Sequence, residues 1–257
     1  MESFWRLPET LSTFGADIDR LFYAVVWITG IVFVAVEVTL VVFLVKYRHR
    51  EGHKAAFVHG NNKLEILWTG ATAVIVLVLG LVSWGLWQEI KNPAYFPEPG
   101  LELEIAARQF EWNVKYPGAD GELGTDDDYV VRNQLHVPVD TPVRITLLAE
   151  DVIHSFFVPE LRLKQDAVPG MQIPVWFEAT RAGDYTIGCA ELCGLGHYRM
   201  RGAMTVHSAD AFQQWRQERQ VAAAGALDAG AAADIGSSAT DAGGEEVAAA
   251  TGATHVH

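Results

Sequence analysis

The stretch CAELCGLGHYRM at residues 189–200 contains both cysteines of this 257-residue chain, together with a histidine and a methionine. In an antiparallel β domain, a loop of this composition wraps around a metal ion. Two thiolates, an imidazole and a thioether are soft ligands that suit copper better than a hard cation. A mononuclear blue-copper site uses one cysteine, so the second, four residues on, lets two sulfurs bridge two copper ions. We therefore interpret Cys189, Cys193, His197 and Met200 as copper ligands.

Two other interpretations of the same residues remain open. Cys189 and Cys193 could form a disulfide, but closing such a short loop gains little stability. A disulfide also leaves His197 and Met200 without a role. Zinc accepts two cysteines and two histidines but has no use for a methionine. The ligand set therefore favours copper over zinc and over a disulfide.

One further nitrogen ligand has to come from elsewhere, and His154 is the best candidate. It lies in EDVIHSFFVP at residues 150–159, after the apolar strand PVRITLLAE and before a second apolar run. An apolar, water-poor shell of this kind tunes a copper centre. The sequence gives no such surroundings to the histidines that we interpret as ordinary side chains, which are His49, His53, His59, His136 and His207.

Two apolar segments predict a helical hairpin in a membrane. Residues 21–45 are interrupted only by Glu37, and residues 66–87 carry no charge; each exceeds the ~20 residues that cross a bilayer. Between them, the stretch KYRHREGHKAAFVHGNNK at residues 46–63 has five Lys or Arg against one acid, which places the connection inside and both chain ends outside. We expect an outer N-terminal segment at residues 1–20 and the hairpin at residues 21–94.

The rest of the chain predicts a β domain followed by a tail. Between residues 95 and 210, short segments rich in β-branched and aromatic residues are bounded by Pro and Gly, which is typical of a β-sandwich or barrel. Residues 211–257 should begin as the end of a helix. From about Val221 they contain mainly Ala, Gly, Ser, Thr and Asp, a composition that predicts disorder.

Charge is unevenly distributed. Residues 95–210 carry eighteen acids and nine bases. A domain of this charge repels nucleic acid and attracts a basic protein. Glu150 and Asp151 flank His154, so they are candidates for docking such a partner.

The segments DVIHSFFVP, LRLKQDAVPGM and CAELCGLGHYRM resemble subunit II of the haem–copper cytochrome c oxidases, and the resemblance runs from about residue 20 to about residue 210. It implies a cupredoxin-like β domain with a dinuclear copper A centre. Cys189 and Cys193 would bridge the two copper ions, with His154 and His197 as terminal ligands and Met200 as a weak axial ligand. Glu191 would bind through its backbone carbonyl, while its carboxylate faces a magnesium ion shared with the large subunit.

The resemblance also implies a function in a complex. The chain would accept electrons from cytochrome c and pass them to haem in the large subunit, subunit I, for oxygen reduction coupled to proton pumping. Subunit III would be a further partner, and the chain would catalyse nothing alone. It would lie in a bacterial cell membrane, with its soluble domain and both termini on the periplasmic side. The sequence contains no CxxCH motif, so haem belongs to the partner.

Three more residues gain an interpretation from the resemblance. Glu65, one residue before the second apolar span, is either an acid that complements a helix start or the entrance of a proton path. In QFEW the family often has two tryptophans, one of which receives the electron; here Phe110 stands at the first position and Trp112 at the second. Both are candidates for the point where electrons enter. The alternatives to an oxidase are the copper subunit of a nitric oxide reductase and a membrane-anchored copper-binding protein.

Overall fold

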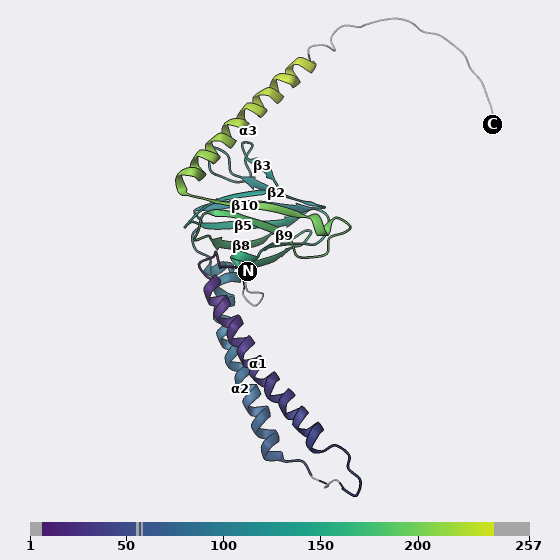
Figure 1. Ribbon diagram of the computed structural model, residues 1–257. Helices are drawn as coiled ribbons and strands as arrows, with labels where there is room; N and C mark the ends of the chain where they lie inside the picture. The colour runs from purple at the N-terminus through teal and green to yellow at the C-terminus, as the bar shows by residue number, and fades with distance from the viewer. Residues whose placement is uncertain (1–6, 55–56, 58, 239–257) are drawn as a thin grey trace, which may run out of the picture.

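The computed structural model describes residues 7–54, 57 and 59–238, with the backbone alone from residue 226 onward. Two long helices, α1 (Gly15–Lys46) and α2 (Asn62–Lys91), run side by side away from a β domain, and a third helix, α3 (Ala209–Ser238), leaves that domain on the opposite side (Figure 1). The predicted combination of a helical hairpin and a β domain is confirmed.

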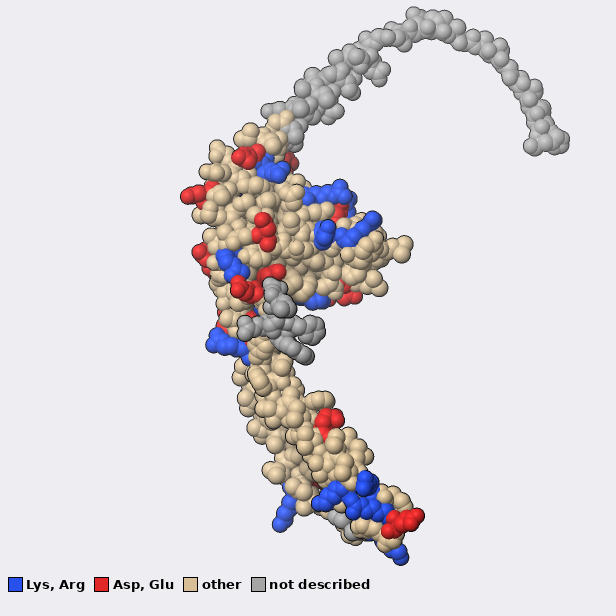
Figure 2. Space-filling model, viewed as in Figure 1, with Lys and Arg blue, Asp and Glu red and all other residues tan. Residues whose placement is uncertain are grey.

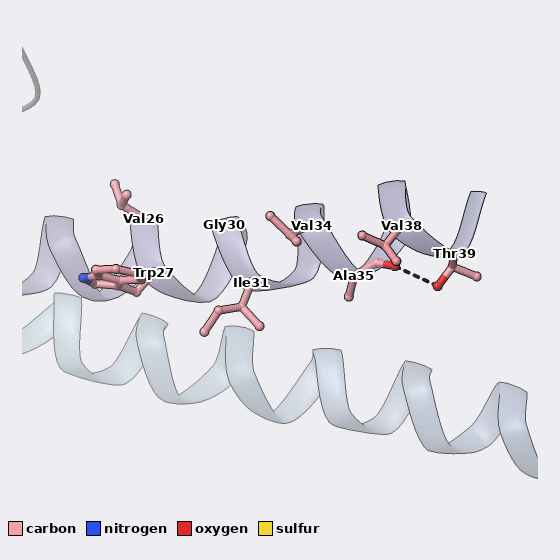
Figure 3. Close-up of a pocket in the computed structure, with 8 residues that line it drawn as sticks. All are labelled: Val26, Trp27, Gly30, Ile31, Val34, Ala35, Val38 and Thr39. Carbon is pink, nitrogen blue, oxygen red and sulfur yellow. Dashed lines mark hydrogen bonds between the residues drawn. The ribbon is translucent and has the colours of Figure 1, made fainter. Parts of the chain in front are cut away.

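Helices α1 and α2 contain the two predicted apolar spans and extend a few residues beyond each. Both are long and apolar enough to cross a membrane, and their apolar side chains are exposed on all sides. A helix that is hydrophobic all round needs an apolar environment. Between Val26 and Thr39, a hydroxyl group of α1 is hydrogen-bonded within the helix (Figure 3). Thr39 donates its hydroxyl to the Ala35 carbonyl at 2.7 Å within the same helix, so it needs no hydrogen bond from lipid.

The β domain is a sandwich of two five-stranded sheets. One has the strand order β3-β2-β1-β5-β8 and the other β4-β10-β9-β6-β7. The strands of the first sheet are β1 (Leu101–Arg108), β2 (Glu111–Tyr116), β3 (Tyr129–Arg132), β5 (Pro142–Ala149) and β8 (Ile173–Glu178). Those of the second are β4 (Gln134–Pro138), β6 (His154–Val158), β7 (Leu163–Ala167), β9 (Gly183–Cys189) and β10 (Arg201–His207). Three short 3₁₀ turns, η1 (Pro93–Tyr95), η2 (Pro159–Leu161) and η3 (His197–Arg199), complete the described elements.

The core lies between the sheets, because side chains alternate between buried and exposed along the strands. Strand β1 shows this alternation, with Leu103 and Ile105 buried and Glu102 exposed. Strands β1 and β5 pair in parallel, as do β10 and β4, whereas the other pairs within the sheets are antiparallel. Non-local pairing of this kind brings chain segments far apart in sequence to one end of the sandwich.

The residues before α1 belong structurally to the β domain, which the sequence did not predict. Leu11 and Phe14 are buried in its core. The Leu11 backbone donates to the Glu160 carbonyl at 2.7 Å and accepts from the Thr180 amide at 2.8 Å. Residues 1–20 were expected to form an outer N-terminal segment; residues 11–14 of it pack against the sandwich, and α1 begins at Gly15. The apolar residues there are too few and too widely spaced to predict this packing.

Two further contacts fix the β domain on the helices. Arg162 donates to both carboxylate oxygens of Asp19, at 2.6 and 2.9 Å. The Trp176 indole donates to the Glu89 carbonyl at 3.2 Å. The domain therefore has a defined orientation relative to the α1–α2 hairpin.

Helix α3 covers the end of the second sheet with Phe212, which is buried, and Trp215, whose ring stacks on His136 at 4.3 Å between centroids. It continues past Val221, where the composition predicted disorder, to Ser238. Alanine has the highest helix propensity, so an Ala-rich segment extends a helix even without a packed face. The last part of the predicted disordered tail, residues 239–257, lies outside the described residues.

Candidate metal centre

Strand pairing brings His154 to the cysteine loop. Strand β6, which begins at His154, pairs with β9, which ends at Cys189, and Phe156 lies opposite Cys189. The Ala190 amide donates to the Ser155 carbonyl at 3.0 Å, which continues the contact into the loop. The loop from Cys189 closes on itself, since the Cys189 amide donates to the Met200 carbonyl at 3.2 Å. Segments about thirty-five residues apart therefore meet at one end of the sandwich.

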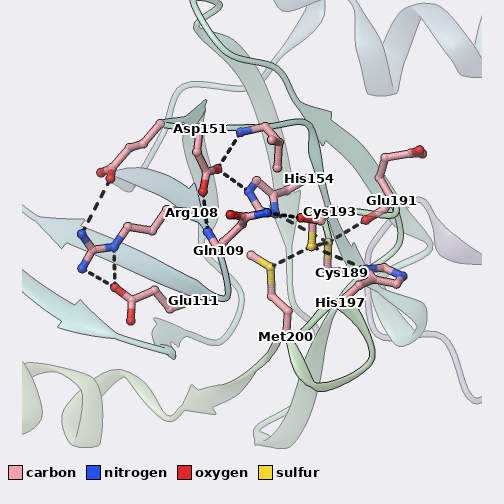
Figure 4. A network of polar contacts seen from close by, with 12 residues as sticks. Arg108, Gln109, Glu111, Asp151, His154, Cys189, Glu191, Cys193, His197 and Met200 are labelled. Atoms are coloured by element: carbon pink, nitrogen blue, oxygen red, sulfur yellow. Dashed lines mark hydrogen bonds and ion pairs between the residues drawn. The ribbon is translucent and has the colours of Figure 1, made fainter. Parts of the chain in front are cut away.

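The predicted ligand atoms form one continuous group (Figure 4). The two cysteine Sγ atoms are 3.8 Å apart. His154 Nδ1 lies 3.9 Å from Cys189 Sγ, and His197 Nδ1 lies 3.7 Å from Cys193 Sγ. Met200 Sδ is 3.7 Å from Cys193 Sγ. The ligand atoms of His154, Cys189 and Cys193 all lie within 4.8 Å of one another, close enough to hold a metal ion, and His197 and Met200 adjoin them at Cys193.

The backbone of Glu191 joins this group, whereas its side chain does not. The Glu191 carbonyl lies 3.2 Å from Cys189 Sγ. Figure 4 shows its carboxylate turned away from the sulfurs, and the residue is exposed. The carbonyl and the carboxylate of Glu191 therefore have different surroundings, and the separate roles that the resemblance implies for them stay predictions.

The donor set fits a soft metal cation. His154 is fully buried, and Cys193 and Met200 are 3% and 2% exposed. Burial first, and then the neighbouring Cys189, raise the pKa of the Cys193 thiol to about 11. Cys193 is buried and Cys189 is partly buried, so two thiolates beside each other here need a cation to become stable, which a bound metal supplies. Both cysteines are free thiols here, so the disulfide alternative is not what the structure contains.

Asp151 holds the imidazole of His154. Its Oδ1 atom accepts from His154 Nε2 at 2.8 Å and from the Val152 amide at 2.7 Å. Its Oδ2 atom accepts from the Gln109 amide at 2.7 Å. Burial opposes ionisation of Asp151, but these hydrogen bonds outweigh it and lower its pKa. A carboxylate on the far nitrogen fixes the tautomer in which His154 Nδ1 is free for a metal.

Gln109 is a residue of the site that sequence reasoning missed. Its side-chain amide donates to the Cys193 carbonyl at 2.6 Å and so ties β1 to the cysteine loop. A glutamine in a β-hairpin turn carries no signal of such a role, because the role depends on where the loop lies in space. Asp151 was predicted for docking, and the structure shows it bonded within the site.

Phe110 and Trp112 have different surroundings in the site. Phe110 is half-buried and packs against the loop: a Cβ atom on Gly196 would come within 2.4 Å of its ring. The Arg199 guanidinium also lies over that ring, 5.8 Å from its centroid. Trp112 is fully buried, with its ring edge-on to His154 at 6.3 Å. Phe110 is therefore near the surface, whereas Trp112 forms part of the apolar wall behind the ligand.

The other predicted site residues lie apart from the metal-binding group. Glu150 is half exposed, with an oxygen 4.0 Å from Arg108. Glu65 lies in the first turn of α2, after Asn61, whose side chain caps the helix by accepting from the Lys63 and Leu64 amides. That position suits an acid at a helix start. The structure therefore places Glu65 at the far end of the hairpin from the β domain (Figure 1).

Comparisons with known proteins point in one direction. Residues 108–207 match the family described as cytochrome c oxidase subunit II, periplasmic domain, and residues 4–86 match its transmembrane domain. The alternative cytochrome c oxidase subunit 2 of Bradyrhizobium diazoefficiens is 34% identical over 242 residues, 84% of this chain and 84% of that protein. The cytochrome c oxidase subunit 2 of Thermostichus vulcanus is 32% identical over 279 residues, 86% of this chain and 82% of that protein. The solved periplasmic domain of subunit II (CoxB) of Bradyrhizobium japonicum is 30% identical with a TM-score of 0.41, covering 48% of this chain and 94% of that one.

Proposed function

The chain belongs to the cytochrome c oxidase subunit II family and is part of a haem–copper oxidase, and on that premise we propose that it holds a dinuclear copper centre that receives electrons from cytochrome c. The observation that carries the proposal is the continuous group of two thiols, two imidazoles and a thioether, with neighbouring atoms 3.7–3.9 Å apart. The family implies copper, and these side chains supply soft ligands for it.

Each ligand has a defined part in the proposed centre. Cys189 and Cys193 would bridge the two ions, and His154 and His197 would complete the coordination at either side. Met200 and the Glu191 carbonyl would be the weaker ligands. When bound, copper supplies a one-electron acceptor and donor, and its bridging thiolates let one electron be shared between two ions.

The protein around the ligands keeps this site rigid and dry. Asp151 and Gln109 hold His154 and the Cys193 backbone in place. Trp112 and Phe156 are fully buried and pack edge-on against each other beside His154. Ligands that are preorganised in a low-dielectric shell move little when charge changes, which suits electron transfer rather than substrate chemistry.

The buried ligands also distinguish this site from that of a copper carrier. A carrier has to release its ion to a partner, so its ligands need to be accessible. Here His154, Cys193 and Met200 have almost no exposed surface, and Cys189 and His197 are partly buried. A closed site therefore favours a resident cofactor over a cargo.

The remaining parts of the function lie in partner subunits. Electrons would pass from the copper centre to haem in the large subunit, where oxygen is reduced and protons are pumped, and subunit III would complete the complex. The exposed Glu191 carboxylate would bind a magnesium ion at the large-subunit boundary. Glu65, at the end of the hairpin with the basic connection, would open a proton path from the inner side; the β domain would then lie on the periplasmic side.

Metal content tests the proposal directly. The copper content of the purified complex is compared with that of a Cys189→Ser, Cys193→Ser double variant, so that the metals of the other subunits cancel. The unchanged complex should contain two more copper ions per chain than the double variant. Either single variant should retain at most one, with an altered visible spectrum. A zinc ion in their place, or a difference of one copper, would contradict the dinuclear centre. Oxygen consumption measured beside nitric oxide consumption decides between an oxidase and a nitric oxide reductase.

A further inference from the structure

A groove lies between α1 and α2 at the end of the hairpin that meets the β domain. Its volume is about 470 Å³. Most of its wall is apolar, with Leu21 and Ala24 from α1 and Leu79, Val82 and Leu86 from α2. Ala24 is the smallest of these side chains, so the two helices leave space beside it. A narrow apolar groove of this kind accepts a hydrocarbon chain.

Three charged side chains line the same groove at its end near the β domain. Asp17 and Arg20 come from the first two turns of α1, and Glu89 comes from the last turn of α2. At about 1.5 Å per residue, Asp17 lies about 10 Å from Ala24 along its helix, and Glu89 about 15 Å from Leu79. The groove is therefore charged at one end and apolar over the rest, as the surface around a phospholipid headgroup and its acyl chain has to be.

Aromatic side chains mark the depth of the charged end in the membrane. Trp84 and Trp87 of α2 are exposed and stack on each other, with ring centroids 5.6 Å apart. Tryptophan is enriched where a membrane meets water, so this level of α2 corresponds to the edge of the hydrocarbon. Glu89 follows two residues after Trp87. Figure 2 shows charged side chains gathered beside the β domain, next to a mainly uncharged length of the two helices. The charged end of the groove therefore lies at the depth of lipid headgroups.

Two other hollows on the described helices have no charged end. One lies on α1 between Val26 and Thr39, and the other on α2 between Trp68 and Leu77; neither is lined by an acid or a base. Such surfaces fit a lipid chain and a partner helix equally well. The groove beside Ala24 differs from them because its charges can select a headgroup.

The position of Glu89 has no explanation within the helix. The dipole of a helix disfavours an acid in its last turn. Glu89 is exposed and forms no ion pair within the part of the chain that the structure describes. A cationic group of a ligand would compensate both effects.

The other charged residues at this junction already have partners. Asp19 forms an ion pair with Arg162 of the β domain. Lys91, at the end of α2, donates to the Lys164 carbonyl at 3.0 Å and to the side-chain oxygen of Gln165 at 2.9 Å. The groove itself is therefore left with two acids and one base.

Within the groove, Arg20 forms an ion pair with Asp17, and both side chains are at least half exposed. An anionic headgroup would bring one more negative charge to a site where acids already outnumber bases. A zwitterionic headgroup brings its phosphate to Arg20, since a guanidinium matches phosphate oxygens, and its amine to Asp17 and Glu89. A primary ammonium has N–H donors for these carboxylates, whereas the quaternary ammonium of choline has none.

We propose that the groove between Asp17, Arg20, Ala24 and Glu89 binds one phospholipid molecule with an ethanolamine headgroup. Its phosphate contacts Arg20, its ammonium contacts Glu89 and Asp17, and one acyl chain lies along the apolar wall beside Ala24. The Glu89 carbonyl accepts from the Trp176 indole of the β domain at 3.2 Å. The lipid therefore binds at the joint that orients the β domain relative to the hairpin, and it stabilises that orientation because a ligand favours the state that binds it.

The test counts lipids retained by the intact oxidase complex. The complex is incubated in detergent with equal amounts of phosphatidylethanolamine and phosphatidylglycerol that have identical acyl chains, then washed, and the retained lipids are counted by mass spectrometry. The unchanged complex should retain one more phosphatidylethanolamine molecule than Ala24→Phe, in which the new ring fills the groove. Ala24 is exposed, so the larger side chain faces the membrane and leaves the fold unchanged. Ala73→Phe is the matched control, because it fills a hollow of α2 that has no charged end.

Charge variants test the choice of headgroup. Arg20→Gln should lower the retention of both lipids. Glu89→Gln should lower the preference for phosphatidylethanolamine over phosphatidylglycerol on the order of tenfold, as expected when a hydrogen bond to a charged group is lost. Glu9→Gln is the matched control, because it removes an exposed acid that pairs with Arg181 of the β domain and does not line the groove.

Three results would overturn the lipid site. Equal lipid counts in the unchanged complex and in Ala24→Phe would show that the groove holds no retained lipid. Equal retention of the two headgroups would show an apolar surface without selectivity. Loss of partner subunits from Ala24→Phe, with unchanged headgroup preference in Glu89→Gln, would show that another subunit covers the groove. The proposal depends only on the hairpin lying in a membrane, so each of these results leaves the copper content, and with it the proposed function, unaffected.

Discussion

Replacing Asp151 by Asn should weaken copper binding without disturbing the fold. The Asp151 carboxylate accepts hydrogen bonds from His154 Nε2 at 2.8 Å and from the Val152 and Gln109 amides at 2.7 Å. An asparagine has one oxygen acceptor, and its amide group is a donor. In the same rotamer, the amide group faces at least one of these three N–H donors at hydrogen-bond distance. Either the imidazole of His154 or the turn before it has to move.

The size of the effect follows from the hydrogen bonds that the carboxylate makes. Removing the outer partner of a ligand histidine costs about 10- to 100-fold in metal affinity, or about 1.4–2.7 kcal/mol at 1.36 kcal/mol per tenfold. The loss of one hydrogen bond to a charged group costs about 1.5–3 kcal/mol, which is close to the loss expected from metal affinity. We therefore expect Asp151→Asn to release copper to a chelator at a concentration roughly ten to a hundred times lower than the unchanged chain requires.

The assay is a chelator competition, followed by the visible absorption of the centre and by metal analysis. Glu150→Gln is the matched control, because it removes the neighbouring acid, whose nearest cation is Arg108 at 4.0 Å. An exposed substitution of this kind should change stability by less than about 0.5 kcal/mol. Equal copper affinities and an unchanged spectrum in Asp151→Asn would refute the positioning role, and Asp151 would then be a surface acid available for docking.

Three further predictions concern pH, protons and the electron route. Burial first, and then His207, lower the pKa of His136 from 6.5 to about 4. Between these pH values His136 is protonated in the unfolded chain and neutral in the folded chain. The free energy of unfolding therefore falls as the pH is lowered from 6.5 to about 4. The loss of stability should be on the order of 1–2 kcal/mol after allowance for solvent screening. The melting temperature, measured from pH 7 to pH 4, should therefore fall less in His136→Gln than in the unchanged chain. Equal falls in the two proteins would contradict this. Glu65→Gln should slow oxygen turnover and leave copper reduction intact. Full turnover would exclude the proton path, and Glu65 would then be only an acid that complements the start of α2. Phe110→Trp should leave donor binding unchanged and keep or raise the rate of copper reduction, measured by stopped flow, and a clearly slower reduction would show that Phe110 is not on the route.

The ligand residues could be predicted because their signal is local. Ligand softness depends on residue type, and Cys189, Cys193, His197 and Met200 lie within one short loop. His154 was the only distant member, and its position between two apolar segments singled it out. The structure places all five in one group.

The supporting residues could not be predicted, because their roles depend on non-local geometry. Gln109 reaches Cys193 only because the β1–β2 turn lies under the cysteine loop. Leu11 and Phe14 join the core through contacts with segments about 150 residues away in sequence. No periodic pattern around them predicts this burial. Trp112 was a candidate for the point where electrons enter, and its burial follows from the alternation of β2, in which Trp112, Val114 and Tyr116 all point inward.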